Sequence, residues 1–275
     1  MVEINKRGLK QRKSIKWNKI KKIMFPIISI LIAILLWEWI VTHLKIPHYI
    51  LPLPSKIWVT LIDKWSIIQT NAFVTLWEIF LGFVCAVLIG GLIAILIVFW
   101  PPFEVTLYPI LVAFQTVPKI ALAPLFVVWF GFGLFPKVIV TFLVAFFPIV
   151  VDTAVGLRSV DPQLLHVVRS MGASRLQVFF KIQFPNALPS IFAGCKVAIT
   201  FAVVGAIVGE FVGSDSGLGY LLLLAMLNLD TVLVFASLGV LTMIGVLLYL
   251  IVESIEKRFV SWHISSRSGE VSKTL

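Results

Sequence analysis

Three glutamates interrupt long apolar stretches of the chain, and they are the residues best suited to polar chemistry. They are Glu38, Glu78 and Glu210. A carboxylate at the centre of a bilayer costs roughly 3 kcal/mol, so such a residue is expected to face protein or a wet cavity. Glu78 shares a helix face with Asn71 and Thr75, at spacings of three and four residues. It is therefore expected to be either a structural hydrogen-bonding group or a residue of a translocation path.

The other acids have different surroundings. Glu38 lies between two tryptophans, which favours an aromatic-belt residue with a snorkelling carboxylate over a path residue. Asp152, near the end of an apolar stretch, is expected to be solvated or paired with Arg158. Glu210 ends another apolar stretch and is a candidate path residue. The glycines that follow it predict a flexible loop: Gly213, Gly217 and Gly219.

A further candidate path segment is an apolar stretch that two prolines interrupt. Gln115 and Thr116 precede Pro118, and Pro124 follows. Proline removes a backbone donor and frees carbonyl groups, which is tolerated at membrane depth where the backbone is buried in protein or lines a cavity. Gln115 and Thr116 are therefore expected to line the translocation path, or to be buried.

Several kinds of chemistry lack the residues that they need. No glycine precedes a lysine, so the chain has no phosphate-binding P-loop and no ATPase of its own. Cys85 and Cys195 lie far apart, and the four histidines form neither an H-E-x-x-H pair nor a Cys/His cluster. We therefore expect no catalytic residue, no metal and no cofactor in this chain. A membrane-embedded enzyme is disfavoured for the same reason.

The elements that must position these residues are transmembrane helices. Apolar residues make up 60% of the chain and charged residues 13%, well below the roughly 25% charged residues of soluble domains. Stretches long enough to cross a hydrocarbon core predict six spans in an all-α membrane protein. They are approximately Met24 to Thr42, Ala72 to Phe99, Val105 to Phe130, Leu134 to Leu157, Ala187 to Val212 and Asp230 to Glu253.

Basic residues predict the orientation. With six spans, 17 of the 23 lysines and arginines fall on one side, so both termini are expected in the cytoplasm of a bacterial cell. One turn departs from this trend, because Trp100 to Glu104 carries no basic residue although it belongs to the same side. The predicted parts are a basic segment 1–23, which would contact anionic lipid, a permease domain 24–256 and a tail 257–275.

A compact polar element lies between the fourth and fifth predicted spans, in the sequence "RSMGASRLQVFFKIQFPNALP". Asp161 and Pro162 predict a helix start, and Gly172 predicts its end. Ser174 is expected to cap a second helix, from Arg175 to about Gln183, which Pro185 would end. The expected product is two short amphipathic helices joined at a glycine.

This element has three possible functions. It could lie on lipid headgroups with its basic residues facing anionic lipid. It could bind DNA as a helix-turn-helix, although a segment tethered between two spans has little reach into a groove. It could also dock into a cytoplasmic partner, which would explain why a chain without an ATPase exposes it.

The run around Gly172 resembles the EAA loop of ABC-importer permeases. Gly172 matches the family's glycine, Ile182 to Pro185 match the distal end, and His166 stands where the family often has glutamate. The segments "QTVPKIALAPLFVVWFGFGLFPKVIV" and "GEFVGSDSGLGYLL" extend the match, which resembles the type I branch serving nitrate, sulfonates, taurine and thiamine-precursor pyrimidines. The resemblance implies an EAA-type coupling loop over 158–186. Its ATPase-coupling residues would be His166, Arg169, Ser170, Met171, Gly172, Ala173, Ser174, Arg175 and Pro185.

The resemblance also implies partners. Such permeases form dimers, dock on two ATPase subunits that bind ATP and Mg, and receive solute from an extracytoplasmic binding protein. Span five carries Gly205 and Gly209, a small-residue face expected either at the dimer seam or in packing within one subunit. The alternative class is a secondary transporter or channel working without ATP.

The resemblance leaves the substrate open within this branch. Along the candidate path, Glu38, Glu78 and Glu210 outnumber Lys119 and Lys196. A route for nitrate or a sulfonate is expected to carry more cations. This favours a heterocycle such as a pyrimidine.

Overall fold

The computed structural model of the chain describes residues 24–260, so the predicted basic segment 1–23 and the tail from 261 onward lie outside the described residues. The described residues divide into two compact units, 24–64 with 225–236, and 65–224 with 237–260. Helices joined by turns and short connections make up both, and the described part of the chain contains no strand. The all-α expectation is confirmed.

The smaller unit contains the apolar helix Met24–His43, α2 (Pro54–Asp63) and the junction between α10 and α11. Pro54 starts α2, because its fixed φ and missing N–H suit the first helical position. The Glu38 carboxylate accepts hydrogen bonds from the backbone N and the Oγ of Ser55, at 3.1 and 2.7 Å. Glu38 therefore satisfies a donor at the start of α2 instead of reaching freely into solvent, which corrects the snorkelling prediction.

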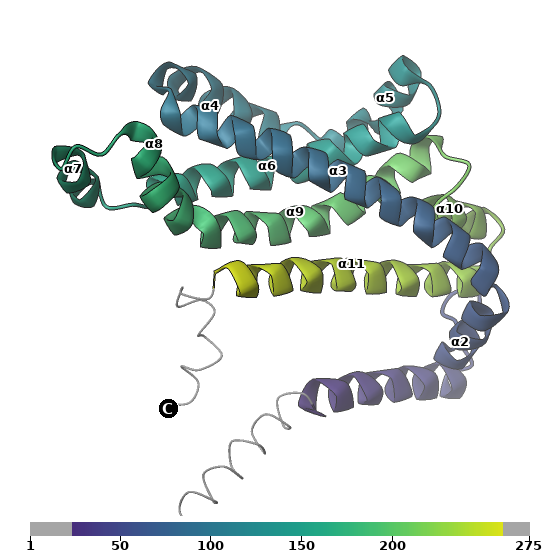
Figure 1. The fold of residues 1–275 in the computed structure, drawn as a ribbon. Helices are drawn as coiled ribbons and strands as arrows, with labels where there is room; N and C mark the ends of the chain where they lie inside the picture. Colours follow the sequence, from purple (N-terminus) through teal and green to yellow (C-terminus); the bar gives the residue numbers. More distant parts are fainter. Residues whose placement is uncertain (1–23, 261–275) are drawn as a thin grey trace, which may run out of the picture. The chain divides into compact units, whose positions relative to one another are not determined.

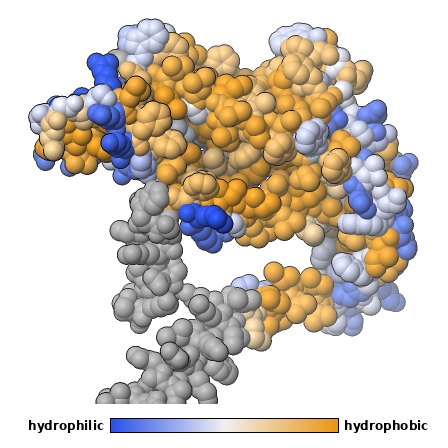
Figure 2. Space-filling view, in the orientation of Figure 1, coloured by the Kyte–Doolittle hydropathy of each residue, from blue (hydrophilic) through white to orange (hydrophobic). Residues whose placement is uncertain are grey.

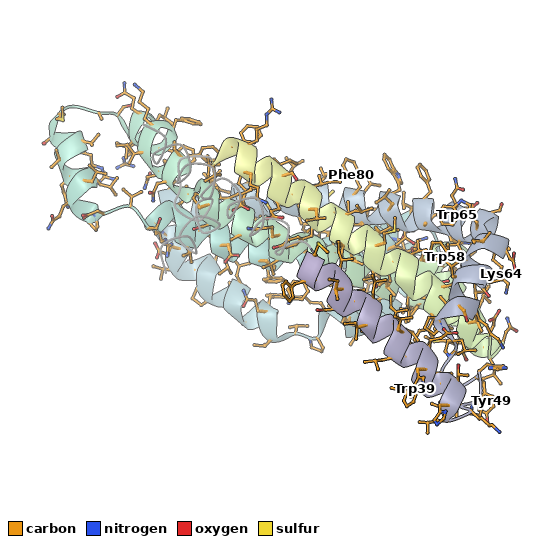
Figure 3. All side chains as sticks on the ribbon, turned by 90° about the horizontal axis from the view of Figure 1, so that it is seen from below. Trp39, Tyr49, Trp58, Lys64, Trp65 and Phe80 are labelled. Atoms are coloured by element: carbon orange, nitrogen blue, oxygen red, sulfur yellow. The ribbon has the colours of Figure 1, made fainter. Side chains whose placement is uncertain are left out.

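Aromatic and charged side chains mark one end of this unit. Trp39, near the end of Met24–His43, and Tyr49, in the turn beyond it, are both exposed, and Figure 3 shows them at the outer edge of the unit. Lys64 Nζ lies 2.7 Å from Asp230 Oδ2, which joins the end of α2 to the residue before α11. Exposed aromatic rings beside polar groups are the composition expected where a span leaves the membrane.

The larger unit is a bundle of long apolar helices with a small projection at one end (Figure 1). Its elements are α3 (Trp65–Phe99), α4 (Pro101–Thr116), η1 (Lys119–Leu122), α5 (Ala123–Phe130), α6 (Leu134–Arg158), α7 (Pro162–Ser170), α8 (Arg175–Val178), η2 (Phe179–Gln183), α9 (Phe184–Gly213), and parts of α10 (Leu218–Leu227) and α11 (Thr231–Phe259).

The core of this unit lies where α6 packs against α3 and α9. Ile79, Ala86 and Ile97 of α3 meet Ile149 of α6 and Ala202 of α9 in one buried cluster. Small residues at this contact let the helix backbones approach closely. Close packing is needed because helices in lipid have no hydrophobic driving force to associate.

Two glycines of α9 let this helix approach the backbone of α6 closely. A Cβ on Gly205 would stand 2.8 Å from Thr141 Cα, and one on Gly209 would stand 3.0 Å from Lys137 Cα. Both contacts are with α6 of the same chain. Of the two alternatives for this pair, packing within one subunit is therefore confirmed, and this face is not available to a dimer seam.

The predicted spans are present, with differences at their ends. Between residues 24 and 260, five helices are long and apolar enough to cross a membrane, and the α4 to α5 segment makes a sixth if it counts as one span. That segment bends by 83° between Thr116 and Lys119, at the interruption predicted from Pro118. Figure 2 shows a largely hydrophobic face over the bundle, with hydrophilic residues gathered around α7 and α8. This distribution suits helices in lipid with a polar element at one end.

One helix boundary differs from its prediction. Pro185 does not end the second short helix, because α8 continues through η2 into α9 as one helix, Arg175–Gly213. In η2 the bonds switch to π-type spacing, and the Phe184 N–H bonds to the Phe179 carbonyl five residues back. Such a π segment lets the helix pass a proline that cannot make the usual bond four residues back. Span five is therefore joined directly to α8.

Candidate functional site

The segment that resembles the EAA loop forms a hairpin of two helices. Asp161 begins α7, with its Oδ1 accepting from the Gln163 N–H at 2.8 Å, and Pro162 follows at the first helical position. Gly172 ends the first helix with φ at +85°, a left-handed conformation that favours glycine. The predicted start and end of α7 are both confirmed.

The second helix starts with a reciprocal cap. The Gln177 N–H donates to Ser174 Oγ at 3.3 Å, and the Ser174 N–H donates to Gln177 Oε1 at 2.8 Å. This capping box satisfies two backbone donors and fixes the direction of α8. We call residues 162–178, which comprise α7, the turn and α8, the α7–α8 hairpin.

The hairpin exposes apolar as well as basic side chains. Leu164, Val167 and Met171 follow helical spacing and are 48%, 55% and 80% exposed. The predicted coupling residues lie on the same element: His166, Arg169, Ser170, Met171, Gly172, Ser174 and Arg175 are exposed, Ala173 is half-buried, and Pro185 lies beyond the hairpin in α9. Figure 1 shows α7 projecting from the end of the bundle, so this surface is free for a partner within the described chain.

One aromatic contact and one ion pair lie at the base of the hairpin. The rings of Phe179 and Phe99 meet edge to face with centroids 4.9 Å apart. Arg158, at the end of α6, pairs with Glu104 of α4 at 3.0 Å. The predicted pairing of Arg158 with Asp152 is therefore wrong, because the Arg158 side chain reaches the next helix instead. These contacts place the turn at 100–104 at the same end as the hairpin.

A second polar cluster lies at the opposite end, inside the bundle. Glu78 is fully buried, and its Oε1 lies 2.5 Å from Nζ of Lys137, which is 4% exposed. Lys137 Nζ also donates to Ser214 Oγ at 2.9 Å. The ion pair, together with the hydrogen bond from Lys137 to Ser214, offsets part of the cost of burying both charges. The pair joins α3 to α6.

Glu210 belongs to the same cluster and is fully buried. Its Oε1 accepts from Thr75 Oγ1 at 2.6 Å, and its Oε2 accepts from the Gly219 N–H. Thr75 Oγ1 accepts from the Leu218 N–H at 2.7 Å, and Asn71 Oδ1 accepts from the Gly217 N–H at 2.7 Å. Three successive donors at the start of α10 are thus satisfied by side chains from α3 and α9.

These contacts bear on the two alternatives for the buried acids. The predicted shared face of Asn71, Thr75 and Glu78 is confirmed, and the structure joins it to Glu210. Because the cluster pairs a lysine and caps a buried helix, its contacts support the structural alternative for Glu78 over the path alternative. The loop after Glu210 is not free, since Gly217 and Gly219 pack against the Glu210 carboxylate.

Gln115 and Thr116 have different surroundings in the structure. Thr116 Oγ1 donates to the Ala113 carbonyl at 2.7 Å. Gln115 lines a cavity of about 390 Å³ with Lys119 and Asp152, formed by the bend after α4 together with α6 and α9. Gln115 therefore stays a candidate path residue with a cavity beside it, whereas Thr116 is engaged with its own helix.

Lys137 is the cluster residue that sequence reasoning missed. It lies within the predicted span Leu134 to Leu157, and in the structure it belongs to α6 among apolar neighbours. A lysine within a long apolar run is a signal for an acidic partner, because an unpaired buried ammonium is costly.

Comparison with known proteins gives the family. Residues 79–261 match the family described as the inner membrane component of binding-protein-dependent transport systems. The chain is 37% identical over 238 residues to the formylaminopyrimidine transport permease protein ThiX of Halalkalibacterium halodurans, covering 86% of this chain and 95% of that protein. It is 28% identical over 272 residues to the taurine transport system permease protein TauC of Escherichia coli, covering 95% and 98%.

A solved structure supports the fold. A chain of the MetNI methionine ABC transporter, in an inward-facing conformation, superposes with a TM-score of 0.64 at 21% identity, covering 72% of this chain and 98% of that one. The chain therefore belongs to the family of inner membrane components of binding-protein-dependent transport systems, and it is a multi-pass permease subunit of an ABC importer for small solutes.

Proposed function

We propose that the α7–α8 hairpin docks on a separate cytoplasmic ATPase subunit and transmits its movement to the membrane helices. ATP and Mg are then bound by that partner. A second copy of the permease, a second ATPase subunit and an extracytoplasmic binding protein complete the importer. Family membership favours this assembly over a carrier or channel working without ATP.

The observation that carries the proposal is the continuous helix from Arg175 to Gly213. At 39 residues it is roughly 60 Å long, so a force on α8 reaches the far end of α9 without a flexible joint. The exposed ridge of Leu164, Val167 and Met171 gives a partner an apolar surface to grip. Closure of two docked ATPases would therefore rock α9 and the helices packed on it, which is how rigid elements alternate access.

Charge supports the orientation. The hairpin carries Arg169 and Arg175, and an excess of basic residues marks the cytoplasmic side of bacterial membrane proteins. With the hairpin in the cytoplasm, both termini are also cytoplasmic in a six-span chain. This is the side on which ATP is available.

The names of the relatives support a substrate class. One relative is named as a formylaminopyrimidine permease and another as a taurine permease. The higher identity to the first favours a pyrimidine-like heterocycle over a sulfonate or nitrate.

The docking role is tested with Gly172→Val, Gly172→Asn and Arg175→Glu in the full complex. The left-handed turn costs valine about 1 kcal/mol or more, whereas asparagine adopts it readily. Arg175 opens α8, where an acidic side chain suits the helix dipole, so Arg175→Glu changes the contact charge without harming the helix. The measurements are recovery of the ATPase with the purified permease and ATP hydrolysis stimulated by the binding protein.

We expect Gly172→Val and Arg175→Glu to lose the ATPase or its stimulation, and Gly172→Asn to retain both. All three proteins should reach the membrane in normal amounts, because Gly172 lies in the turn of the hairpin and Arg175 is the exposed first residue of α8. Normal ATPase recovery and normal stimulation in both damaging variants would return the hairpin to a lipid-facing role.

A further inference from the structure

The bend in the third span opens a cavity that the docking role does not use. It has a volume of about 390 Å³, within the range of roughly 300–1,000 Å³ that small-molecule sites occupy. Gln115 and Lys119 line it from the bend, Phe147 and Asp152 from α6, and Phe201 from α9. The cavity therefore lies where three helices of the bundle meet, and the broken helix forms one wall.

Two opposite charges line this cavity without pairing with each other. Lys119 Nζ donates to the Gln115 carbonyl at 3.3 Å and lies 4.3 Å from the centre of the Phe147 ring. Within residues 24–260, the Asp152 carboxylate takes part in no ion pair or side-chain hydrogen bond, and Arg158 pairs with Glu104 instead. Both groups thus keep hydrogen-bonding capacity that a ligand can use.

Helix packing holds Asp152 in place. A Cβ on Gly194 of α9 would stand 2.9 Å from Asp152 Cβ, so α9 backs directly onto this residue. An intramembrane acid held by packing and left without a partner is a functional residue by default. Apart from Gln115, the remaining lining is apolar, with valines of α6 and α9, Pro148 and the side chains of Phe147 and Phe201.

We propose that this cavity is the substrate site of the permease and that it binds a flat, amino-substituted nitrogen heterocycle of pyrimidine size. The proposal rests on the importer function and adds the residues of recognition. Asp152 accepts hydrogen bonds from the exocyclic amino group, Lys119 donates to a ring nitrogen or carbonyl, and Phe147 and Phe201 cover the ring.

The apolar lining distinguishes this class from a small zwitterion. A zwitterion such as taurine would also satisfy one cation and one anion, but it has little apolar surface to place against two aromatic rings. A heterocycle uses both the charges and the rings. Binding then depends on the amino group through Asp152 and on the ring through Phe201.

The site is tested by equilibrium binding to the full-length chain with its ATPase in lipid nanodiscs, without ATP. The probe is radiolabelled 4-amino-2-methylpyrimidine, and the comparison compounds are 2-methylpyrimidine, which lacks the amino group, and taurine. The variants are Asp152→Asn and Phe201→Ala. Their matched controls are Asp215→Asn, in an exposed loop, and Phe211→Ala, on α9 outside the cavity.

We expect the aminopyrimidine to bind the wild type and to lose about tenfold in affinity in Asp152→Asn, which corresponds to about 1.4 kcal/mol. Phe201→Ala should weaken binding of both pyrimidines, and neither control should change it. Phe201 is 45% exposed, so Phe201→Ala should fold even if Asp152→Asn does not.

Three results would overturn the proposal: no aminopyrimidine binding to the wild type, equal affinity in wild type and Asp152→Asn, or taurine binding that requires Asp152 in place of the pyrimidine. Uptake of the aminopyrimidine into proteoliposomes, measured with and without ATP, distinguishes failure of the cavity proposal from failure of the importer function. Normal uptake with unchanged binding in Asp152→Asn rejects the cavity proposal alone. Uptake by the wild type that does not depend on ATP rejects the importer function.

Discussion

Lys137 lies in the first turn of α6, where a cation opposes the helix dipole, and its ammonium is almost fully buried. Such a residue is tolerated only with a close counter-charge, which Glu78 provides from α3. The pair therefore contributes less as an attraction than as a constraint, because either partner alone would be a buried, uncompensated charge.

This constraint predicts a specific pattern of variants. Glu78→Gln and Lys137→Met should each lower the unfolding free energy by about 3 kcal/mol or more, because each leaves one charge buried alone. The double variant should recover most of the loss. The measurements are the amount of monodisperse protein after solubilisation and its melting temperature in detergent.

Lys196→Met is the matched control, because Lys196 pairs with Glu256 at 2.7 Å but is more exposed than Lys137. It should cost much less stability. A Glu78→Gln protein that is normally abundant and stable but altered in transport would instead favour the path alternative for Glu78.

The cap on α10 yields a second prediction. A Cβ at Gly219 would lie 2.7 Å from Glu210 Oε2, so Gly219→Ala should displace the carboxylate and destabilise the protein by about 2 kcal/mol. Gly239→Ala, in α11, meets nothing within 4 Å and should be neutral or slightly stabilising. Equal melting temperatures of the two variants would contradict the tight packing around Glu210.

At this scale the sequence predicts neighbours along one helix but not partners across helices. Asn71, Thr75 and Glu78 could be placed on one face from their spacing alone. Glu210 is 135 residues from Thr75, and nothing local relates them. The spacing of Glu78 alone therefore leaves its role open, and the packing of α3, α6 and α9 supports the structural alternative.

At the scale of elements, local rules predicted the hairpin well. Asp161, Gly172 and Ser174 were predicted as two helix starts and a stop, because caps depend on a few adjacent residues. The prediction that Pro185 ends the second helix was wrong. A proline ends a helix or is accommodated within it, depending on whether the preceding turn widens to π spacing. Phe179, the first residue of the π segment, packs against Phe99 of α3, so this turn has long-range contacts that local rules do not include.

The contact between α9 and α6 makes the third prediction. Gly205→Val should cost about 2 kcal/mol or more of stability, because the added atoms would meet the Thr141 backbone. Gly245→Val, in α11, has only a side-chain atom of Val203 at 3.8 Å and should be tolerated. Melting temperatures of the two variants, compared in the same detergent, measure the difference.

The oligomeric state adds an independent readout for this prediction. If Gly205 acted only at a seam between two copies, Gly205→Val would yield a stable, folded chain that no longer dimerises. Packing within one chain predicts instead that the folded chain itself is lost. Size-exclusion chromatography separates the two results.

At the scale of the whole molecule, the larger unit has two distinct ends. Arg158 pairs with Glu104, so the turn at 100–104 lies with the hairpin although it carries no basic residue. Lys137 bonds to Ser214, so the start of α6 lies with the loop after α9 at the other end. The contacts thus indicate which connections share a side, and the charge distribution predicts which of the two sides faces the cytoplasm.

This separation predicts the result of topology mapping in full. Reporter fusions in the first group should all report the cytoplasm, and those in the second group should all report the outside. The first group comprises fusions after Lys22, Pro101, Arg175 and Arg258, and the second comprises fusions near Lys56, Phe135 and Ser216. Pro101 is the informative position, because charge gives no reason to place it inside whereas the Arg158 to Glu104 pair does. A periplasmic signal at Arg175 would place the hairpin on the side of the membrane that lacks ATP, and it would reject the docking proposal. A periplasmic signal at Pro101 with a cytoplasmic one at Arg175 would show that only one of the third and fourth spans crosses the membrane, because the count of crossings between those two positions would then be odd. The signal near Phe135 would show which of the two crosses, since an outside signal there leaves the bent third span as the one that does not.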